Sequence, residues 1–181
     1  MEKKTQGETP EVKLVMGILA SSRNDLKRAH EVVSSSFGWI DLQSDIIPFD
    51  YTHYYDREMG EHILRQYISF EKLIHPGELW QIKLATNELE DSERVDGNRV
   101  INLDPGYLSQ CALVLATTKE ASHRVYINGG IYGQPMLYYM KSGFMPFELT
   151  YADYADEKNR VFFDKVRDAY RKQIGAAETR K

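Results

Sequence analysis

Residues 12–20 read VKLVMGILA, a mostly apolar run with several β-branched residues. Such a run predicts a buried strand. The residues that follow, SSRND, are typical of a helix N-terminus, and apolar side chains then recur at helical spacing over 25–37. Gly38 stands where helices commonly end in a glycine. The beginning of the chain therefore predicts a buried strand followed by a helix.

The next residues continue this alternation of strands and helices. We expect three more strands, at 39–49, 65–74 and 99–103. A second helix is expected at 77–91, between the last two of these strands, because apolar residues repeat there on one stripe. The resulting order of strand, helix, strand, strand, helix and strand matches the ferredoxin-like βαββαβ unit.

The second half of the chain predicts further strands and one helix. Apolar or alternating runs predict strands at 111–117, 124–128, 131–140 and 144–149. The last helix is expected at 157–173, where apolar residues recur on one face. The predicted fold class is α+β, with a ferredoxin-like βαββαβ unit extended by antiparallel strands and followed by a C-terminal helix.

Length and composition indicate one globular domain. The chain has 181 residues, of which 42% are hydrophobic and 28% are charged, as in an ordinary globular protein. We predict a single α+β domain over 12–174. The polar ends, at 1–11 and 175–181, are predicted to be flexible tails.

Charge, cysteine content and hydropathy exclude several classes of protein. The formal net charge of −4 and the pI near 5.8 argue against a basic field for nucleic acid. The single Cys cannot form an internal disulfide or a Cys-rich zinc site. No apolar run approaches the roughly 18 residues that a membrane span needs, and the polar start MEKKTQGETPEVK is unlike a signal peptide. We therefore predict a cytoplasmic protein that does not bind a membrane, and nucleic acid is disfavoured as a partner.

The first of three polar clusters is FDYTHYYDREMG at 49–60. It gathers three acids, a His, an Arg and three Tyr in twelve positions. Phenol rings have an apolar body and a polar tip, which suits a partly wet pocket, so Tyr54 is a candidate ligand contact. Asp50 and Glu58 are candidate catalytic carboxylates. The alternative is a solvated loop whose Tyr rings cover the edge of the sheet.

The second cluster is NLDPGY at 102–107. Its Asp-Pro-Gly sequence predicts a tight turn at the end of a strand, with Gly106 in a left-handed conformation. Asp104 is a candidate catalytic acid or base, or a ligand for a cation, and Tyr107 is a candidate ligand contact. The alternative is that the Asp104 carboxylate only caps the turn.

The third cluster is TTKEASHR at 117–124, between two predicted strands. It places Lys119, His123 and Arg124 on one hairpin and so concentrates positive charge in an acidic protein. A phosphate or carboxylate ligand requires such a concentration, and His123 is also a candidate catalytic base. The alternative is an exposed, charged hairpin tip.

The tyrosines are unevenly distributed along the chain. Nine of the twelve Tyr lie in 51–55 and 126–154, which predicts that these two stretches face each other. The alternative explanation is that aromatic residues favour strands in general.

Around the three clusters the sequence resembles a known family. The stretches that carry the resemblance are FDYTHYYDREMG at 49–60, LATNELE at 84–90, NLDPGYL at 102–108, VLATTKEASHRVYINGGIY at 114–132 and LTYADY at 149–154. They are similar to stretches of the domain-of-unknown-function 4416 family of bacterial and archaeal proteins. Some members are labelled GTP-binding, which implies nucleotide binding, although this chain has neither a GxxxxGK[ST] phosphate loop nor an NKxD-type motif. Two positions depart from the family pattern: Gln134 stands where an acid is common, and Ala152 where Pro is usual.

These observations lead to one expected function and to alternatives. We expect the protein to bind a phosphorylated small molecule or a nucleotide at a Tyr-rich polar site, where Lys119, His123 and Arg124 hold the phosphate. The three candidate carboxylates would bind a divalent cation, with Mg²⁺ as the candidate, or act as acid and base. The alternative is a non-catalytic adaptor that uses the Tyr-rich face for a protein partner. RNA binding on the sheet is a third hypothesis, which the net charge of −4 disfavours.

Overall fold

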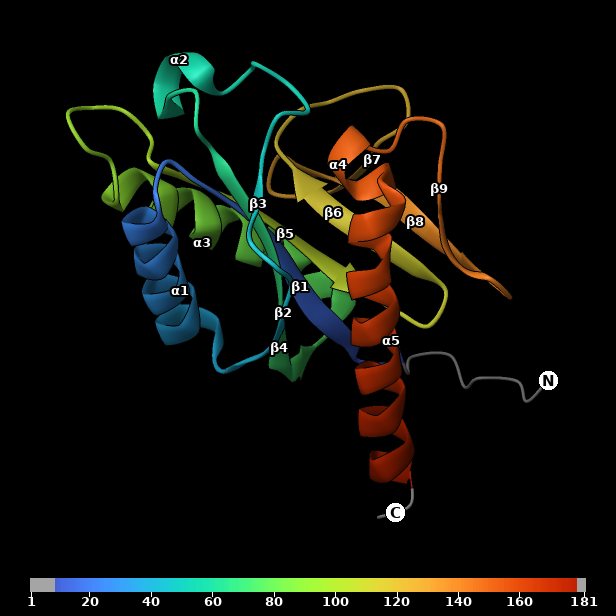
Figure 1. Cartoon of the computed structure of the whole chain (residues 1–181). Helices are drawn as coiled ribbons and strands as arrows, with labels where there is room; N and C mark the ends of the chain where they lie inside the picture. Colours follow the sequence, from blue (N-terminus) through green and yellow to red (C-terminus); the bar gives the residue numbers. More distant parts are fainter. Residues whose placement is uncertain (1–8, 179–181) are drawn as a thin grey trace.

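The stretch Val12–Ala20 forms β1, an inner strand of the computed structural model, which describes residues 9–178 (Figure 1). All nine residues of β1 are buried. A strand that is covered on both faces buries every side chain, so its sequence is a continuous apolar run. Lys13 interrupts the run, and its ammonium group is buried in an ion pair with Asp41.

Eight further strands join β1 in one sheet within the described range. They are β2 (Ile40–Gln43), β3 (Ile47–Pro48), β4 (Leu64–Ile74), β5 (Ile101–Leu108), β6 (Ala112–Thr117), β7 (Val125–Asn128), β8 (Ile131–Met140) and β9 (Gly143–Pro146). The order along the sheet is β2-β4-β1-β5-β6-β8-β7, while β3 pairs with β4 and β9 pairs with β8. Every one of these pairings is antiparallel.

Helices lie on both faces of the sheet. They are α1 (Arg23–Phe37), α2 (Asp56–Met59), α3 (Leu79–Ser92), α4 (Ala152–Ala155) and α5 (Glu157–Glu178), with a 3₁₀ turn at Pro76–Glu78. Figure 1 shows α1 and α3 on one side of the sheet and α5 on the other. The helix α2 and the short helix α4 lie at the same end of the molecule (Figure 1).

Alternate residues of β1 supply two hydrophobic cores. Met16 and Ile18 pack in a cluster that includes Ile82 of α3. Val15 points to the opposite face and belongs to a cluster that includes Phe163 of α5. Because successive side chains of a strand alternate between faces, one apolar strand holds the helices of both layers.

The predicted α+β class is confirmed, with an antiparallel sheet and a long C-terminal helix. Strands and helices β1, α1, β2, β4, α3 and β5 follow in the predicted chain order, with β3 and α2 inserted before β4. The four strands β2, β4, β1 and β5 are neighbours in the sheet, in that order. The assignment of this half to a ferredoxin-like unit stays a prediction, as does the single domain over 12–174.

Two segments before β6 differ from the sequence prediction. The strand predicted at 39–49 is divided into β2 and β3, which pair with different parts of β4. Residues 104–106, which were expected to form a turn, lie inside β5, and Gly106 has no positive φ. The ladder between β1 and β5 runs without interruption from Ala20–Ile101 to Lys13–Leu108 and holds the Asp-Pro-Gly sequence extended. Tertiary pairing here overrides a local turn preference.

The predicted hairpin between β6 and β7 is wrong. Both strands pair with β8 and lie on opposite sides of it. Residues 118–124 therefore cross the end of β8 instead of reversing between two neighbouring strands. The tight hairpin is the one between β7 and β8, where Gly129 and Gly130 both have positive φ, as a two-residue turn requires.

The C-terminal helix is longer than predicted. Residues 175–178 continue α5, although they were expected to belong to a flexible tail. The remaining parts of the predicted tails, 1–8 and 179–181, lie outside the described residues.

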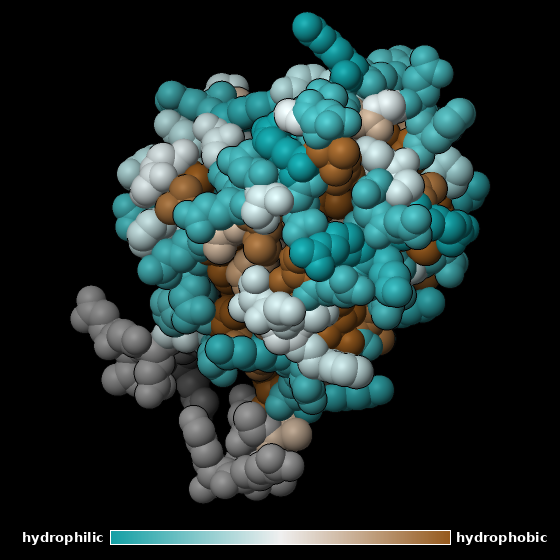
Figure 2. All heavy atoms as spheres, turned by 90° about the vertical axis from the view of Figure 1, so that its left-hand side faces the viewer, coloured by the Kyte–Doolittle hydropathy of each residue, from teal (hydrophilic) through white to brown (hydrophobic). Residues whose placement is uncertain are grey.

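Hydrophilic side chains dominate the outer side of α1. Figure 2 views the molecule from this side, and apolar residues are visible there mainly in gaps between polar ones. Within residues 9–178 no helix is both long and apolar enough to cross a membrane. The cytoplasmic location stays a prediction.

The packing of α3 on β1 leads to a stability prediction. We expect Ile82→Ala to lower the free energy of unfolding by about 2–5 kcal/mol, because Ile82 is buried in the core between α1, α3 and β1. Urea denaturation followed by circular dichroism measures this change. The matched control is Leu84→Ala on the same helix, where the side chain is 37% exposed and we expect a loss of about 1 kcal/mol or less. Equal effects of the two variants would show that the helix presents a different face to the sheet.

Candidate functional site

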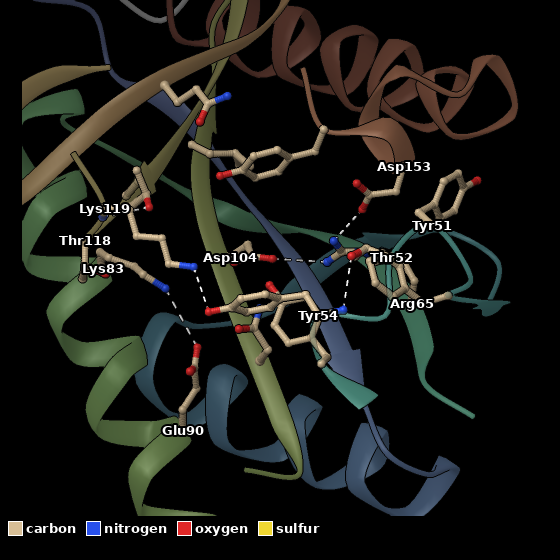
Figure 3. A pocket seen from close by; sticks show the side chains of 18 of the residues that line it. Tyr51, Thr52, Tyr54, Arg65, Lys83, Glu90, Asp104, Thr118, Lys119 and Asp153 are labelled. Carbon is tan, nitrogen blue, oxygen red and sulfur yellow. Dashed lines mark hydrogen bonds and ion pairs between the residues drawn. The ribbon is translucent and has the colours of Figure 1, made fainter. Parts of the chain in front are cut away.

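A pocket opens where β5 separates from β6. The two strands pair only over Gly106–Leu108, although β6 continues beyond this ladder to Thr117. The cavity has a volume of about 600 Å³ and is lined by the loop that contains residues 49–55, by α3, β5, β6 and α4, and by the segment after β6. Segments that are far apart in the sequence thus meet at one end of the sheet (Figure 3).

Two side chains of α3 replace the missing strand at the free edge of β5. The backbone N–H of Leu103 donates to Glu90 Oε1 at 2.7 Å, and Lys83 Nζ donates to the carbonyl oxygen of Leu103 at 2.9 Å. Lys83 and Glu90 also form an ion pair of 3.9 Å and are both buried. A buried backbone group without a partner is costly, so these contacts stabilise the open edge. Burial raises the pKa of Glu90, although the charge of Lys83 opposes this shift.

Pro105 fits the point at which the two strands part. It lies two residues after Leu103, so its backbone faces the same neighbour, β6. Proline has no N–H to donate to a ladder, and the pairing with β6 begins only at the next residue, Gly106. The sequence Asp-Pro-Gly therefore ends a ladder instead of making a turn.

A network of charges forms the wall next to α3. Arg99 Nη2 donates to Glu58 Oε2 at 2.8 Å, and Arg99 Nη1 donates to Glu90 Oε2 at 3.2 Å. The same Nη1 atom donates to Asn102 Oδ1 at 2.9 Å, and the buried Nδ2 of Asn102 has no hydrogen-bond partner within the described part of the chain. The positive charges of this wall, on Lys83 and Arg99, are balanced by two carboxylates.

The floor of the pocket is built around Arg65. Its guanidinium is buried, with Nη2 2.5 Å from Asp153 Oδ2 and Nη1 3.4 Å from Asp104 Oδ2. The guanidinium also lies about 5 Å from the ring centres of Phe49 and Tyr67. Burial alone would lower the pKa of Arg65, but the charge of Asp153 and its other neighbours hold this pKa well above the ordinary value. Arg65 is therefore a permanent buried cation.

Gly17 of β1 makes room for this floor. In the register of the sheet Gly17 lies opposite Tyr67 on one side and Asp104 on the other. A Cβ atom at this position would lie 2.3 Å from Tyr154 Oη and 2.8 Å from Arg65 Nη1. The glycine in VKLVMGILA is thus required by the buried side chains that pack over it.

The segment after β6 supplies the opposite wall. Arg124 donates from Nε to Gln134 Oε1 at 2.8 Å, from Nη1 to the carbonyl oxygen of Lys119 at 2.8 Å and from Nη2 to Tyr151 Oη at 3.1 Å. Lys119 Nζ donates to Tyr54 Oη at 3.0 Å. All these acceptors are neutral groups. Within residues 9–178, no carboxylate oxygen lies within 4.0 Å of a charged nitrogen of Lys119 or Arg124.

Four tyrosines line the pocket. They are Tyr51, Tyr54, Tyr55 and Tyr151. Burial raises the pKa of Tyr55 and Tyr151, and burial together with the Asp156 carboxylate raises the pKa of Tyr51 to about 12. The exposed Tyr54 differs, because its hydrogen bond from Lys119 lowers its pKa. Tyr51, Tyr55 and Tyr151 therefore act as neutral walls and hydrogen-bonding groups at neutral pH.

A family model for the domain of unknown function DUF4416 matches residues 10–170. The chain belongs to the DUF4416 family. No curated protein and no solved structure matches it. The match includes every segment that lines the pocket of this DUF4416 chain.

Four of the residues predicted from the sequence line the DUF4416 pocket, namely Tyr54, Asp104, Lys119 and Arg124. The predicted approach of the two Tyr-rich stretches is also seen here, because Tyr51, Tyr54 and Tyr55 line the same cavity as Tyr151.

The other predicted site residues do not line this cavity. Asp50 is exposed. Glu58 forms ion pairs with Arg94 and Arg99 and does not itself line the cavity. His123 lies on the crossing segment but outside the cavity, and Tyr107 packs against the apolar face of the sheet near α3. Of the three carboxylates that were expected to bind a cation or act as acid and base, Asp104 alone lines the pocket, and their chemical roles stay predictions. Over the described residues no group of three or more His, Cys, Asp or Glu is arranged to hold a metal ion.

Several residues of the DUF4416 pocket were not found by sequence reasoning. The most informative is Arg65, a charged residue at the start of an apolar strand, which is itself a signal of a buried ion pair. Its partner Asp153 suits a helix N-cap in sequence, but its carboxylate is buried against Arg65. Lys83 and Asn87 lie four residues apart beside an apolar helical stripe, a spacing that favours a solvated flank in the sequence, whereas the structure buries Lys83 and places both residues in the lining.

The contacts of Glu90 at the free edge of β5 are tested by two matched variants. Glu90→Leu should cost about 1–3 kcal/mol more unfolding free energy than Glu90→Gln, because only Gln still accepts from the buried Leu103 N–H. Both variants remove the carboxylate beside Lys83, so their difference isolates the hydrogen bond. Urea denaturation of the two proteins at pH 7 gives the comparison.

The same pair also has an expected pH dependence. Because the pKa of Glu90 is raised in the folded protein, folding binds its proton more tightly, and the wild type should lose stability relative to Glu90→Gln as the pH rises from about 4. If the wild type instead gained stability relative to Glu90→Gln as the pH rose, the raised pKa of Glu90 would be contradicted.

The space at Gly17 is tested by a double-mutant cycle. Gly17→Ala should lower the free energy of unfolding by about 1–3 kcal/mol, because its methyl group collides with Tyr154 and Arg65. Tyr154→Phe should be nearly neutral, since the Tyr154 hydroxyl is buried without a partner in the described residues. The double variant should recover part of the loss, as thermal denaturation would show. Simple additivity of the two changes would mean that the hydroxyl does not limit the space above β1.

Proposed function

We propose that the pocket binds a small phosphorylated ligand, such as a nucleotide, with its phosphate against Lys119 and Arg124. The observation that carries the proposal is the charge balance of the lining. The cations Arg65, Lys83 and Arg99 have carboxylate partners, whereas Lys119 and Arg124 contact only neutral oxygens. Two uncompensated positive charges at one wall favour a doubly charged anion.

Arg124 is oriented for such a ligand before it binds. A guanidinium has five N–H groups, and three of those of Arg124 are used in contacts with Gln134, Lys119 and Tyr151. One N–H on each Nη atom is left for a ligand, and these two bonds suit the paired oxygens of a phosphate. A carboxylate in place of Gln134 would neutralise Arg124, while the amide holds it without removing its charge.

The shape of the pocket is consistent with more than a bare phosphate. Its volume of about 600 Å³ lies inside the roughly 300–1,000 Å³ that is typical of small-molecule sites. Tyr54, Tyr55 and Tyr151 offer flat, largely apolar walls, which suit a base or a sugar ring. Mg²⁺ would enter such a site together with the phosphate, because Mg²⁺ is commonly bound by few carboxylates and by substrate oxygens.

The adaptor hypothesis has weaker support. It requires an exposed Tyr-rich face, but Tyr51, Tyr55 and Tyr151 are partly buried and turned to the cavity. Of the tyrosines that line the pocket, Tyr54 alone is largely exposed, at 63%. We therefore favour a small-molecule site over a protein-binding face.

The proposal is tested with Lys119→Gln. We expect this variant to bind nucleotides or pyrophosphate at least about 10-fold more weakly than the wild type, because a charge-assisted contact is worth about 1.5–3 kcal/mol. Isothermal titration calorimetry with a panel of nucleoside mono-, di- and triphosphates, with and without Mg²⁺, measures the affinity. Lys119 is exposed, so the fold should be unaffected.

Lys141→Gln is the matched control, because Lys141 is an exposed lysine in the turn between β8 and β9, outside the pocket. It should bind like the wild type. Failure of every phosphate compound to bind the wild type, or equal binding by both variants, would contradict the proposed function.

A further inference from the structure

Asp104 is the carboxylate that the pocket leaves least neutralised. Two carboxylates face the single guanidinium of Arg65, and Asp153 takes the close contact at 2.5 Å. Asp153 also accepts a hydrogen bond of 3.0 Å from Tyr67 Oη and is buried. The contact of Asp104 with Arg65 is longer, 3.4 Å. The floor therefore has one negative charge more than it has positive charges.

The acceptor capacity of Asp104 is largely unused. A carboxylate accepts about four hydrogen bonds, and the contact with Arg65 is the one hydrogen bond that the Asp104 carboxylate makes within the described residues. Its side chain is 20% exposed, whereas that of Asp153 is 4% exposed. Figure 3 shows Asp104 near the middle of the cavity, with Lys119 on one side and Arg65 on the other. A ligand can reach this carboxylate without displacing a protein partner.

The wall and the floor of the pocket thus have net charges of opposite sign. The wall at Lys119 and Arg124 has an excess of positive charge, and the floor at Asp104 has an excess of negative charge. A ligand that is only anionic would satisfy the wall and would be repelled at the floor. A ligand with charges of both signs would satisfy the two ends together.

We propose that the ligand is amphoteric and that a protonated amine of the ligand binds Asp104 while its phosphate binds Lys119 and Arg124. This inference rests on the proposed phosphate site. An amine is favoured over a hydroxyl because a partly buried carboxylate gains more from a cationic donor than from a neutral one. The ligand class is therefore a phosphorylated amine.

The aromatic residues around Asp104 support a cationic group. The phenols of Tyr55 and Tyr151 both lie close enough for the Asp104 charge to raise their pKa values, although burial is the larger cause for each. The faces of such rings attract cations. A protonated amine at Asp104 would therefore be stabilised both by a carboxylate and by the face of an aromatic ring.

A matched pair of small phosphates tests the inference directly. Pyridoxamine 5′-phosphate and pyridoxine 5′-phosphate share a flat ring and a phosphate and differ in an aminomethyl group where the other has a hydroxymethyl group. We expect the wild type to bind the amine at least about 10-fold more tightly in isothermal titration calorimetry at pH 7, which corresponds to about 1.4 kcal/mol. In Asp104→Asn this preference should disappear, while the affinity for pyridoxine 5′-phosphate should be kept or improved.

Asp168→Asn is the control, because Asp168 is an exposed acid on α5 far from the lining, and it should keep the preference of the wild type. Equal binding of the two probes by the wild type, absence of binding of the amine at millimolar concentration, or a preference that persists in Asp104→Asn would each overturn the inference. The proposed function is judged separately, by the nucleotide panel and Lys119→Gln. Nucleotide binding that is weakened by Lys119→Gln, with no preference for the amine, would leave the phosphate site standing and remove the amphoteric ligand.

Discussion

The backbone of Leu103 is the constraint on which the pocket depends. Where β5 leaves β6, one N–H and one carbonyl group lose the partners that a neighbouring strand would supply. Glu90 and Lys83 take over these two hydrogen bonds from α3. Because these two side chains make the hydrogen bonds that a strand would otherwise make, β5 and β6 can stay apart, and the cavity occupies the space between them. A helix that covered the sheet with apolar residues alone would leave the edge of β5 unpaired and would favour closure of the gap.

Buried charge is the second requirement of the site, and the sheet is adapted to it. Arg65 lies on β4 with Asp153 from α4 and Asp104 from β5, so three segments are held by one guanidinium. Breaking a buried pair leaves an uncompensated charge, which is strongly unfavourable. Gly17 provides the space for this cluster, because any larger residue on β1 would collide with it. The geometry of the floor is therefore linked to the central strand of the fold.

The distribution of charge gives the pocket two different ends. The crossing segment after β6 presents Lys119 and Arg124 without carboxylate partners, while the floor presents Asp104 with one distant partner. Both ends are rigidly supported, since Arg124 is held by Gln134 and Asp104 lies within a strand that pairs along its length with β1. Preorganised charges bind a ligand with little ordering cost, and this supports the proposal of a ligand site in this cavity.

Local patterns are sufficient to predict most of the elements. VKLVMGILA predicts a buried strand, the helical stripes predict α1, α3 and α5, and the antiparallel α+β class follows from their order. Of the candidate residues that the sequence suggests, Tyr54, Asp104, Lys119 and Arg124 line the cavity, and they could be found because polar clusters between apolar runs are local features. The extended conformation of Asp-Pro-Gly within β5 and the crossing of β8 by residues 118–124 depend on long-range pairing, since pairing with distant strands outweighs local turn preferences. The same holds for Arg65 and its partner Asp153, which lie 88 residues apart and come together through packing that no local pattern encodes.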